Sequence, residues 1–177
     1  MKISFNANNF TRMYRAKTSI DNKNISDSST EKFNIKKEQH KVYLKSDDML
    51  YSGGNGSGLS FYIKYAQNSS KDNPMVIAKG VDENGKEFEQ TIKINDINPS
   101  SSSIVEMRAL EAYLNVDKGG GISSLPKESG FLGLNDRSDF LGMFENVIRD
   151  MNILGRHDLA MIYLKNLQIY SDFVKKK

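Results

Sequence analysis

PMVIAKGVDENGKEFEQTIKINDINPSSSSIVEMRALEAYL, residues 74–114, decides the fold, because it predicts two β-strands, the turn between them and a capped helix. After the turn, apolar and polar residues alternate with the period of two expected of a strand with one buried face. The apolar set is Phe88, Ile92 and Ile94, and the polar set is Glu87, Glu89, Thr91 and Lys93. Residues 75–81 are rich in apolar and β-branched residues and predict the partner strand. Asn84 and Gly85 tolerate the positive φ of a hairpin turn.

A third strand is predicted upstream of this hairpin, over residues 59–66. Its alternation favours burial of Leu59, Phe61, Ile63 and Tyr65. Residues 49–51 predict a short extended piece, and the glycine-rich residues 52–58 predict a flexible loop. An antiparallel sheet of this kind needs a cover for its apolar face. We therefore expect an α+β fold, with a three- to four-stranded antiparallel meander covered by about three C-terminal helices.

The helices are predicted from their caps and apolar stripes. Ser103 and Glu106 match a capping box at the start of the first helix. Asn135 or Asp136 is expected to cap the second helix, and Gly155 to end it. A final helix over about residues 156–174 should form an antiparallel hairpin with the second. It carries more apolar residues than one buried stripe needs, since Met161, Leu164, Ile169 and Phe173 lie outside that stripe. This surplus predicts burial against two neighbours, or contact with a protein partner or a second copy.

The segment between the first two helices, residues 115–135, is long for a loop in a compact domain. Its apolar residues are expected to pin parts of it to the core, and they are Ile122, Leu125, Phe131, Leu132 and Leu134. Residues 118–124 resemble a phosphate-binding loop only in being rich in glycine, because the G-x-x-x-x-G-K-[ST] order is missing. A flexible loop is the simpler interpretation. As a hypothesis, the binding residues of this loop are Lys118, Gly119, Gly120, Gly121, Ser123, Asn135 and Asp136.

Composition and charge restrict the class of protein. The chain has 177 residues, 38% of them hydrophobic, and no cysteine, so disulfides and zinc–thiolate sites are excluded. The net charge of +3 is too small to predict a nucleic-acid partner. It is unevenly placed, because residues 1–45 contain ten basic and four acidic residues. We expect residues 1–40 to be a basic polar leader, largely disordered, with binding to an anionic surface as the alternative, and residues 41–177 to be a single α+β domain.

Catalytic and metal-binding patterns are missing from the sequence. The two histidines, His40 and His157, lie in different regions, so a metal site would need carboxylates. His157 and Asp158 are adjacent on a helix and do not face each other. No serine lies in a G-x-S-x-G elbow. We therefore expect no catalytic residues, no metal site and no cofactor, although this does not exclude an enzyme.

Three segments resemble those of a set of small uncharacterised proteins from the Firmicutes. They are KGVDENGKEFEQTI (79–92), VEMRALEAYL (105–114) and GLNDRSDF (133–140). The resemblance covers roughly the last 120 residues and includes no catalytic motif. It implies a bacterial origin and no assigned activity.

These observations favour a non-enzymatic binding or interaction module. One alternative is a protein exported without a cleaved signal peptide, for example by a flagellar or related secretion system, because the first 39 residues are rich in Ser, Asn and Thr. Another is an enzyme that uses carboxylates near residues 115–135. Residues 1–10 contain no signal-peptide core, and no apolar run is long enough to span a membrane. The expected protein is soluble, and is cytoplasmic or secreted by a signal-independent route.

Overall fold

The computed structural model describes residues 43–116 and 123–176. These residues belong to one compact unit of the chain. The predicted leader at residues 1–40 therefore lies outside the described residues. In chain order the elements are β1 (Tyr51–Gly54), β2 (Ser60–Tyr65), β3 (Met75–Val81), β4 (Glu87–Lys93), the 3₁₀ helix η2 (Ile94–Asp96), β5 (Ser102–Ser103), α1 (Ile104–Tyr113), the 3₁₀ helix η4 (Lys127–Phe131), β6 (Arg137–Ser138), α2 (Phe140–Ile153) and α3 (His157–Lys175).

The predicted hairpin is confirmed as β3 and β4, which pair antiparallel from Met75 opposite Lys93 to Val81 opposite Glu87. The Asp82 carboxylate stabilises the turn by accepting hydrogen bonds from the backbone N–H of residue 84 at 2.9 Å and of residue 86 at 2.8 Å. Gly85 has a φ of 78°, whereas the preceding asparagine does not adopt a positive φ. One left-handed residue therefore suffices for this turn, because an aspartate side chain holds the rest.

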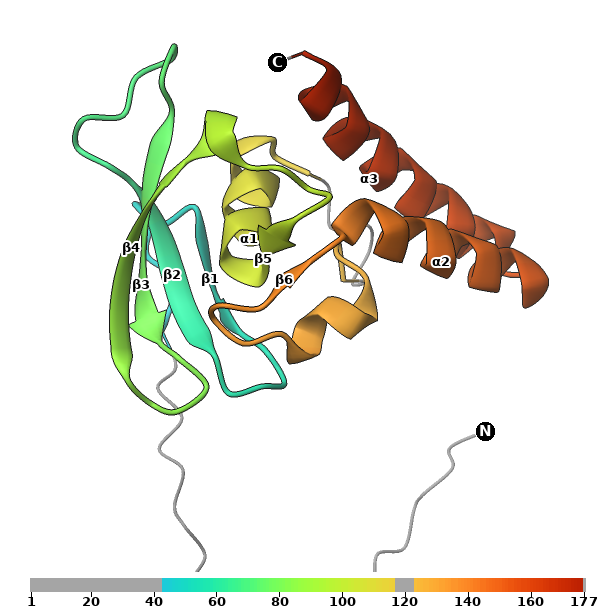
Figure 1. Ribbon diagram of the computed structural model, residues 1–177, viewed down its shortest axis with the longest axis horizontal. Helices are drawn as coiled ribbons and strands as arrows, with labels where there is room; N and C mark the ends of the chain where they lie inside the picture. The colour runs from blue at the N-terminus through green and yellow to red at the C-terminus, as the bar shows by residue number, and fades with distance from the viewer. Residues whose placement is uncertain (1–42, 117–122, 177) are drawn as a thin grey trace, which may run out of the picture. The chain divides into compact units, whose positions relative to one another are not determined.

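The sheet is antiparallel, with the strand order β1-β2-β3-β4 (Figure 1). Strand β1 corrects the prediction of a flexible loop over 52–58, because Tyr51–Gly54 pairs with Ser60–Ile63 of β2. The burial of Leu59, Phe61 and Ile63 is as predicted. The prediction was wrong for Tyr65, which is 52% exposed at the end of its strand.

Helix α1 covers one face of the sheet (Figure 1). The predicted capping box is present: Ser103 Oγ accepts from the backbone N–H of Glu106 at 3.2 Å, and the Glu106 carboxylate accepts from the backbone N–H of Ser103 at 2.9 Å. The helix is buried on more than one stripe, since Val105, Ala109 and Glu111 are buried in addition to Ile104, Met107 and Leu110. Such broad burial requires a second layer on the side of α1 that faces away from the sheet.

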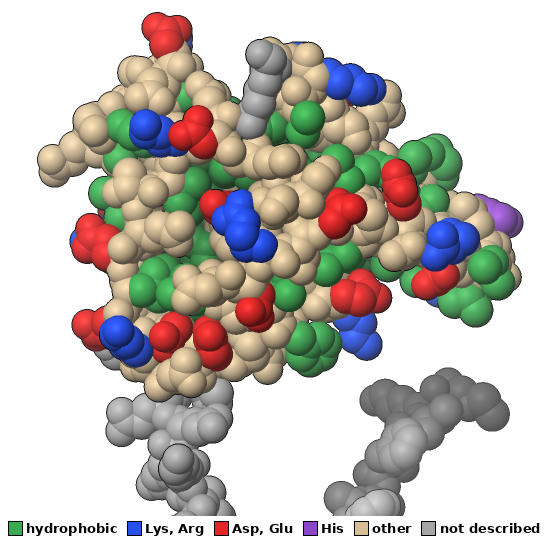
Figure 2. All heavy atoms as spheres, in the orientation of Figure 1, with side chains coloured by type: hydrophobic (Ala, Val, Ile, Leu, Met, Phe, Trp, Pro, Cys, Tyr) green, Lys and Arg blue, Asp and Glu red, His purple; other side chains and the backbone are tan. Residues whose placement is uncertain are grey.

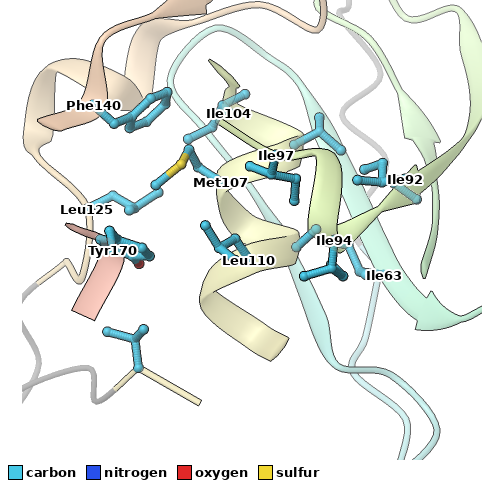
Figure 3. Packing of buried hydrophobic residues seen from close by; sticks show 14 of the residues in the cluster. Ile63, Ile92, Ile94, Ile97, Ile104, Met107, Leu110, Leu125, Phe140 and Tyr170 are labelled. Carbon is cyan, nitrogen blue, oxygen red and sulfur yellow. The ribbon is translucent and has the colours of Figure 1, made fainter. Parts of the chain in front are cut away.

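The α2–α3 hairpin supplies this second layer (Figure 1). Isoleucines lie on the side of α1 that faces the sheet, and Leu125, Phe140 and Tyr170 lie on the opposite side (Figure 3). The α+β fold is therefore a sheet, a central helix and a helix hairpin around one core.

The start of α2 differs from the prediction, while its end does not. Asp139, and neither Asn135 nor Asp136, caps the helix by accepting from the backbone N–H of Gly142 at 3.1 Å. The reason is the two-residue strand β6, which pairs with β5 and keeps the chain extended up to residue 138. Gly155 ends the helix with a φ of 70°, as predicted.

The segment between α1 and α2 is more ordered than a loop over its described residues. It contains η4 and β6, and Leu125 is fully buried in the core. Leu132 and Leu134 pack against the core as predicted, whereas Phe131 is 67% exposed, so the prediction was wrong there. Ile122 lies outside the described residues.

Candidate functional site

The α2–α3 hairpin has two apolar faces, and only one of them is buried. On the inner face, Phe144 lies 5.6 Å from Tyr170 and 6.2 Å from Tyr163 between ring centroids. All three rings are buried. The inner face of each helix therefore packs against the core, and the apolar side chains on the outer face are exposed to solvent.

The outer face carries the largest group of exposed apolar side chains in the described residues. Ile153 and Leu154, at the end of α2, are 77% and 69% exposed. Met161 and Leu164, on the first turns of α3, are 62% and 43% exposed. Figure 2 shows hydrophobic side chains around this end of the hairpin, next to its histidine. These four residues form the hairpin patch.

An open hollow of about 650 Å³ lies between the two helices, and Ile153 and Leu164 of the hairpin patch line part of it. Its floor is apolar, because Ile148, Leu164 and Leu167 line it. Glu145 and Arg149 stand at its rim, one helical turn apart on α2. A shallow apolar groove with charges at the rim has the form of a surface that receives a helix. It offers no enclosed volume for a small substrate.

A second candidate site is a cluster of ionisable groups in the interior. Arg108 Nη1 of α1 lies 2.7 Å from Glu111 Oε2 and 3.1 Å from Ser124 Oγ. Ser124 also donates to the Glu111 carboxylate, and its carbonyl accepts from Asn166 Nδ2 of α3 at 3.1 Å. The Arg108 guanidinium lies 5.5 Å from the centre of the Tyr51 ring. These contacts join the sheet, α1, α3 and residue 124.

Burial controls the protonation of this cluster. It raises the pKa of Tyr170 far above its usual value, with the Glu111 carboxylate adding to the effect. Burial likewise raises the pKa of Tyr51. For Arg108, burial alone would lower the pKa, but the neighbouring Glu111 raises it above the ordinary value. The tyrosines are therefore neutral and the arginine is charged at neutral pH, the states that a structural network requires.

The interior cluster is closed to substrates. Glu111 and Ser124 are 2% and 4% exposed, and each is occupied by its hydrogen-bond partners. This arrangement ties α1 to residue 124 and to α3. The sequence offered one signal for it, a pair of opposite charges at i and i+3 on a helix.

The predicted binding loop is only partly within the described residues. Lys118, Gly119, Gly120 and Gly121 lie outside them. Ser123 is exposed and precedes the cluster residue Ser124. Asn135 and Asp136 are exposed at the far end of the segment, where the Asp136 carboxylate accepts from the backbone N–H of Gly133 at 2.8 Å. In the described residues no hydrogen bond joins Ser123 to Asn135 or Asp136, and their grouping in a site stays a prediction.

Residues 130–134 instead bind two turns of the sheet. Glu83, in the β3–β4 turn, accepts from the backbone N–H of Leu134 at 2.9 Å. Asn55 donates to the Leu132 carbonyl at 2.7 Å, and the Gly56 N–H donates to the Gly130 carbonyl at 2.7 Å. The glycine-rich residues after β1 are thus held in place by this segment. These contacts do not follow from the sequence, because a lone glutamate in a turn is expected to be solvated.

Within residues 43–116 and 123–176, no three His, Asp or Glu side chains form a group that would hold a metal ion. His157 Nδ1 lies 2.9 Å from Asn152 Oδ1, while Asp158 pairs with Arg156. No helix in the described part of the chain combines the length and apolar character needed to cross a membrane. Scans against protein-family models, curated proteins and solved structures identify no match.

Proposed function

We propose that this protein is a non-enzymatic interaction module that binds a protein partner through the α2–α3 hairpin. The observation that carries the proposal is the hairpin patch beside the groove. Of the eight large apolar side chains exposed in the described residues, five lie on the hairpin or in its turn, and four of these form the patch. Scattered exposed apolar residues need no explanation, but a contiguous group beside a groove is typical of a protein interface.

The energetics also favour an occupant for this face. Fully burying a large aliphatic side chain contributes about 1.5 to 3 kcal/mol. Ile153, Leu154 and Met161 expose most of their surface, so covering them makes available a few kcal/mol that the folded chain alone does not gain. The interior cluster supports the non-enzymatic part of the proposal, because Arg108, Glu111 and Ser124 are buried or half-buried and bonded to one another.

Photo-cross-linking in the cells that produce the protein tests this proposal. A benzoylphenylalanine replaces Met161 in the full-length chain, and a matched control carries it at Thr91, which is exposed on β4. We expect covalent protein adducts from position 161 that are missing from position 91. Adding Leu164→Glu, which puts a charge in the groove, should remove them. Equal adduct yields from both positions, or no adduct from position 161, would contradict the proposal.

A further inference from the structure

We infer that the occupant of the hairpin groove is a second copy of this chain, which docks across a two-fold axis to form a four-helix arrangement. This inference rests on the proposed function and names its partner. It places α2 of one protomer antiparallel to α2 of its partner. An isologous interface of this kind uses the same patch twice, so the patch must be complementary to itself.

The charges at the rim meet this requirement. Glu145, Ile148, Arg149 and Asn152 follow one another at i, i+3, i+4 and i+7, so they share one face of α2. Across a two-fold axis that passes midway between these two charges, Glu145 lies opposite Arg149 of the partner subunit. The symmetry repeats the contact, so two identical ion pairs form. Paired charges of this kind fix the register of an interface.

The apolar groups are arranged for the same occupant. Ile148, Leu164 and Leu167 lie between the two helices, and Ile153 lies at one end of the groove. Antiparallel docking brings two such grooves together, so every apolar side chain that one protomer covers is also covered in its partner. The rim carries one charge of each sign and no net charge. The rim therefore gives no net electrostatic attraction to the basic residues 1–45. Its two charges are instead complementary to those of the same rim on a second copy.

Sedimentation equilibrium of the full-length chain tests the inference. The monomer mass is 20.0 kDa, and we expect a mass of twice this value at micromolar concentration. Arg149→Glu should raise the dissociation constant at least about tenfold, because like charges then face each other at both symmetry-related contacts. Glu145→Arg should have the same effect. The double variant Glu145→Arg/Arg149→Glu should restore the parent value, since it only reverses each pair.

Controls separate loss of docking from loss of fold. Both rim residues are exposed, so circular dichroism should be unchanged in every variant. Leu164→Glu should give a monomer, whereas Leu44→Glu, which puts the same charge on an 85% exposed leucine outside the hairpin, should leave the dimer intact. A monomer at all concentrations would overturn the inference. So would a dimer that responds equally to Leu164→Glu and Leu44→Glu.

The remaining outcomes distinguish this inference from the proposed function. If the parent chain is a monomer while cross-links from position 161 join it to a different protein, the proposed function stands and the second copy is the wrong occupant. If deletion of residues 1–42 converts a monomer into a dimer, the leader of the same chain occupies the groove, and the inference fails. If the chain is a monomer and position 161 forms no adduct, both proposals fail.

Discussion

At the scale of single residues, Tyr170 is the side chain whose chemistry is least satisfied. It is fully buried, and its hydroxyl has no hydrogen-bond partner among the described residues. An unsatisfied buried polar group costs about 1 to 3 kcal/mol. We therefore expect Tyr170→Phe to raise the free energy of unfolding by about 1 kcal/mol in urea titrations at neutral pH. Tyr163→Phe, at a tyrosine that remains 7% exposed, is the matched control and should change it less. A loss of stability in Tyr170→Phe would mean that the hydroxyl makes a stabilising bond.

The same tyrosine predicts sensitivity to alkali. Burial raises the pKa of Tyr170, so the folded chain keeps its proton at a pH where the unfolded chain, with an ordinary pKa of about 10, releases it. The free energy of unfolding is therefore independent of this proton below about pH 10. Above about pH 10 it falls by up to about 1.4 kcal/mol per pH unit. The stability advantage of Tyr170→Phe should widen between about pH 9 and about pH 11. Parallel stability curves for the two proteins would contradict this explanation.

Individual residues differ in how far the sequence determines their role. Ser103 and Glu106 were predicted correctly, because a capping box depends only on neighbours three positions apart. Arg108 and Glu111 have the same spacing, but their importance comes from burial. That burial is caused by α3 and by residue 124. The spacing of residues within α1 does not predict these contacts.

At the scale of elements, the capping box is what fixes the start of α1. Ser103→Ala removes the hydroxyl that accepts from the N–H of Glu106. We expect a loss of about 1 kcal/mol in the free energy of unfolding, the usual cost of a lost serine cap. The control, Ser101→Ala, changes an exposed serine just before the helix and should stay within about 0.5 kcal/mol of the parent. Equal effects of the two substitutions would mean that the cap is not what holds this end.

The sheet depends on a glycine in β3. A Cβ at Gly80 would lie 2.1 Å from the Ser60 carbonyl oxygen and 2.6 Å from the Phe61 Cβ of the neighbouring strand. Because backbone atoms cannot move aside, Gly80→Ala should lower the free energy of unfolding by about 3 kcal/mol or more. Gly130→Ala is the control, since a Cβ there meets nothing within 4 Å, and it should be neutral or slightly stabilising. Chemical denaturation of both variants provides the measurement, and a neutral Gly80→Ala would refute the close approach.

Elements with strong internal signals were predictable, and elements defined by distant pairing were not. Strands β3 and β4 carry their own alternation and turn, so their antiparallel pairing followed from the sequence. Strands β5 and β6 have two residues each and exist only because they pair with each other. Their pairing moves the cap of α2 to Asp139, three residues beyond Asp136. The glycines at 53 and 54 were assigned to a loop because glycine disfavours strands, and pairing with β2 overrides that preference.

At the scale of the whole molecule, the sequence predicted that helices cover the sheet but not their order. Helix α1 is central because apolar side chains surround it, and the hairpin covers α1 on the side away from the sheet. The sequence placed Met161 and Leu164 outside the buried stripe of the final helix, and both are exposed in the folded chain. Ile169 and Phe173 are instead packed against the core. Ile153 and Leu154 were missed as part of this surface because they lie at the turn, where apolar periodicity ends.

Removing the hairpin should therefore unfold the molecule. Five buried side chains of α2 and α3 belong to the same core as the sheet and α1: Phe140, Phe144, Val147, Tyr163 and Tyr170. At about 2 kcal/mol each, their loss equals roughly the whole stability of a typical domain, about 5 to 15 kcal/mol. A chain that ends at residue 139 should show no cooperative melting in near-ultraviolet circular dichroism and should bind a hydrophobic dye.

The full-length double variant Met161→Glu/Leu164→Glu separates the two roles of the hairpin. Its substitutions lie only on the outer face, at side chains that are 62% and 43% exposed. We expect it to keep a cooperative melting transition, because the inner face that covers α1 is untouched. If the chain ending at residue 139 also melts cooperatively, the sheet and α1 form an independent core, and the hairpin is an appended module. If instead only the truncated chain fails to fold, one hairpin both completes the core with its inner face and leaves its outer face free for a partner.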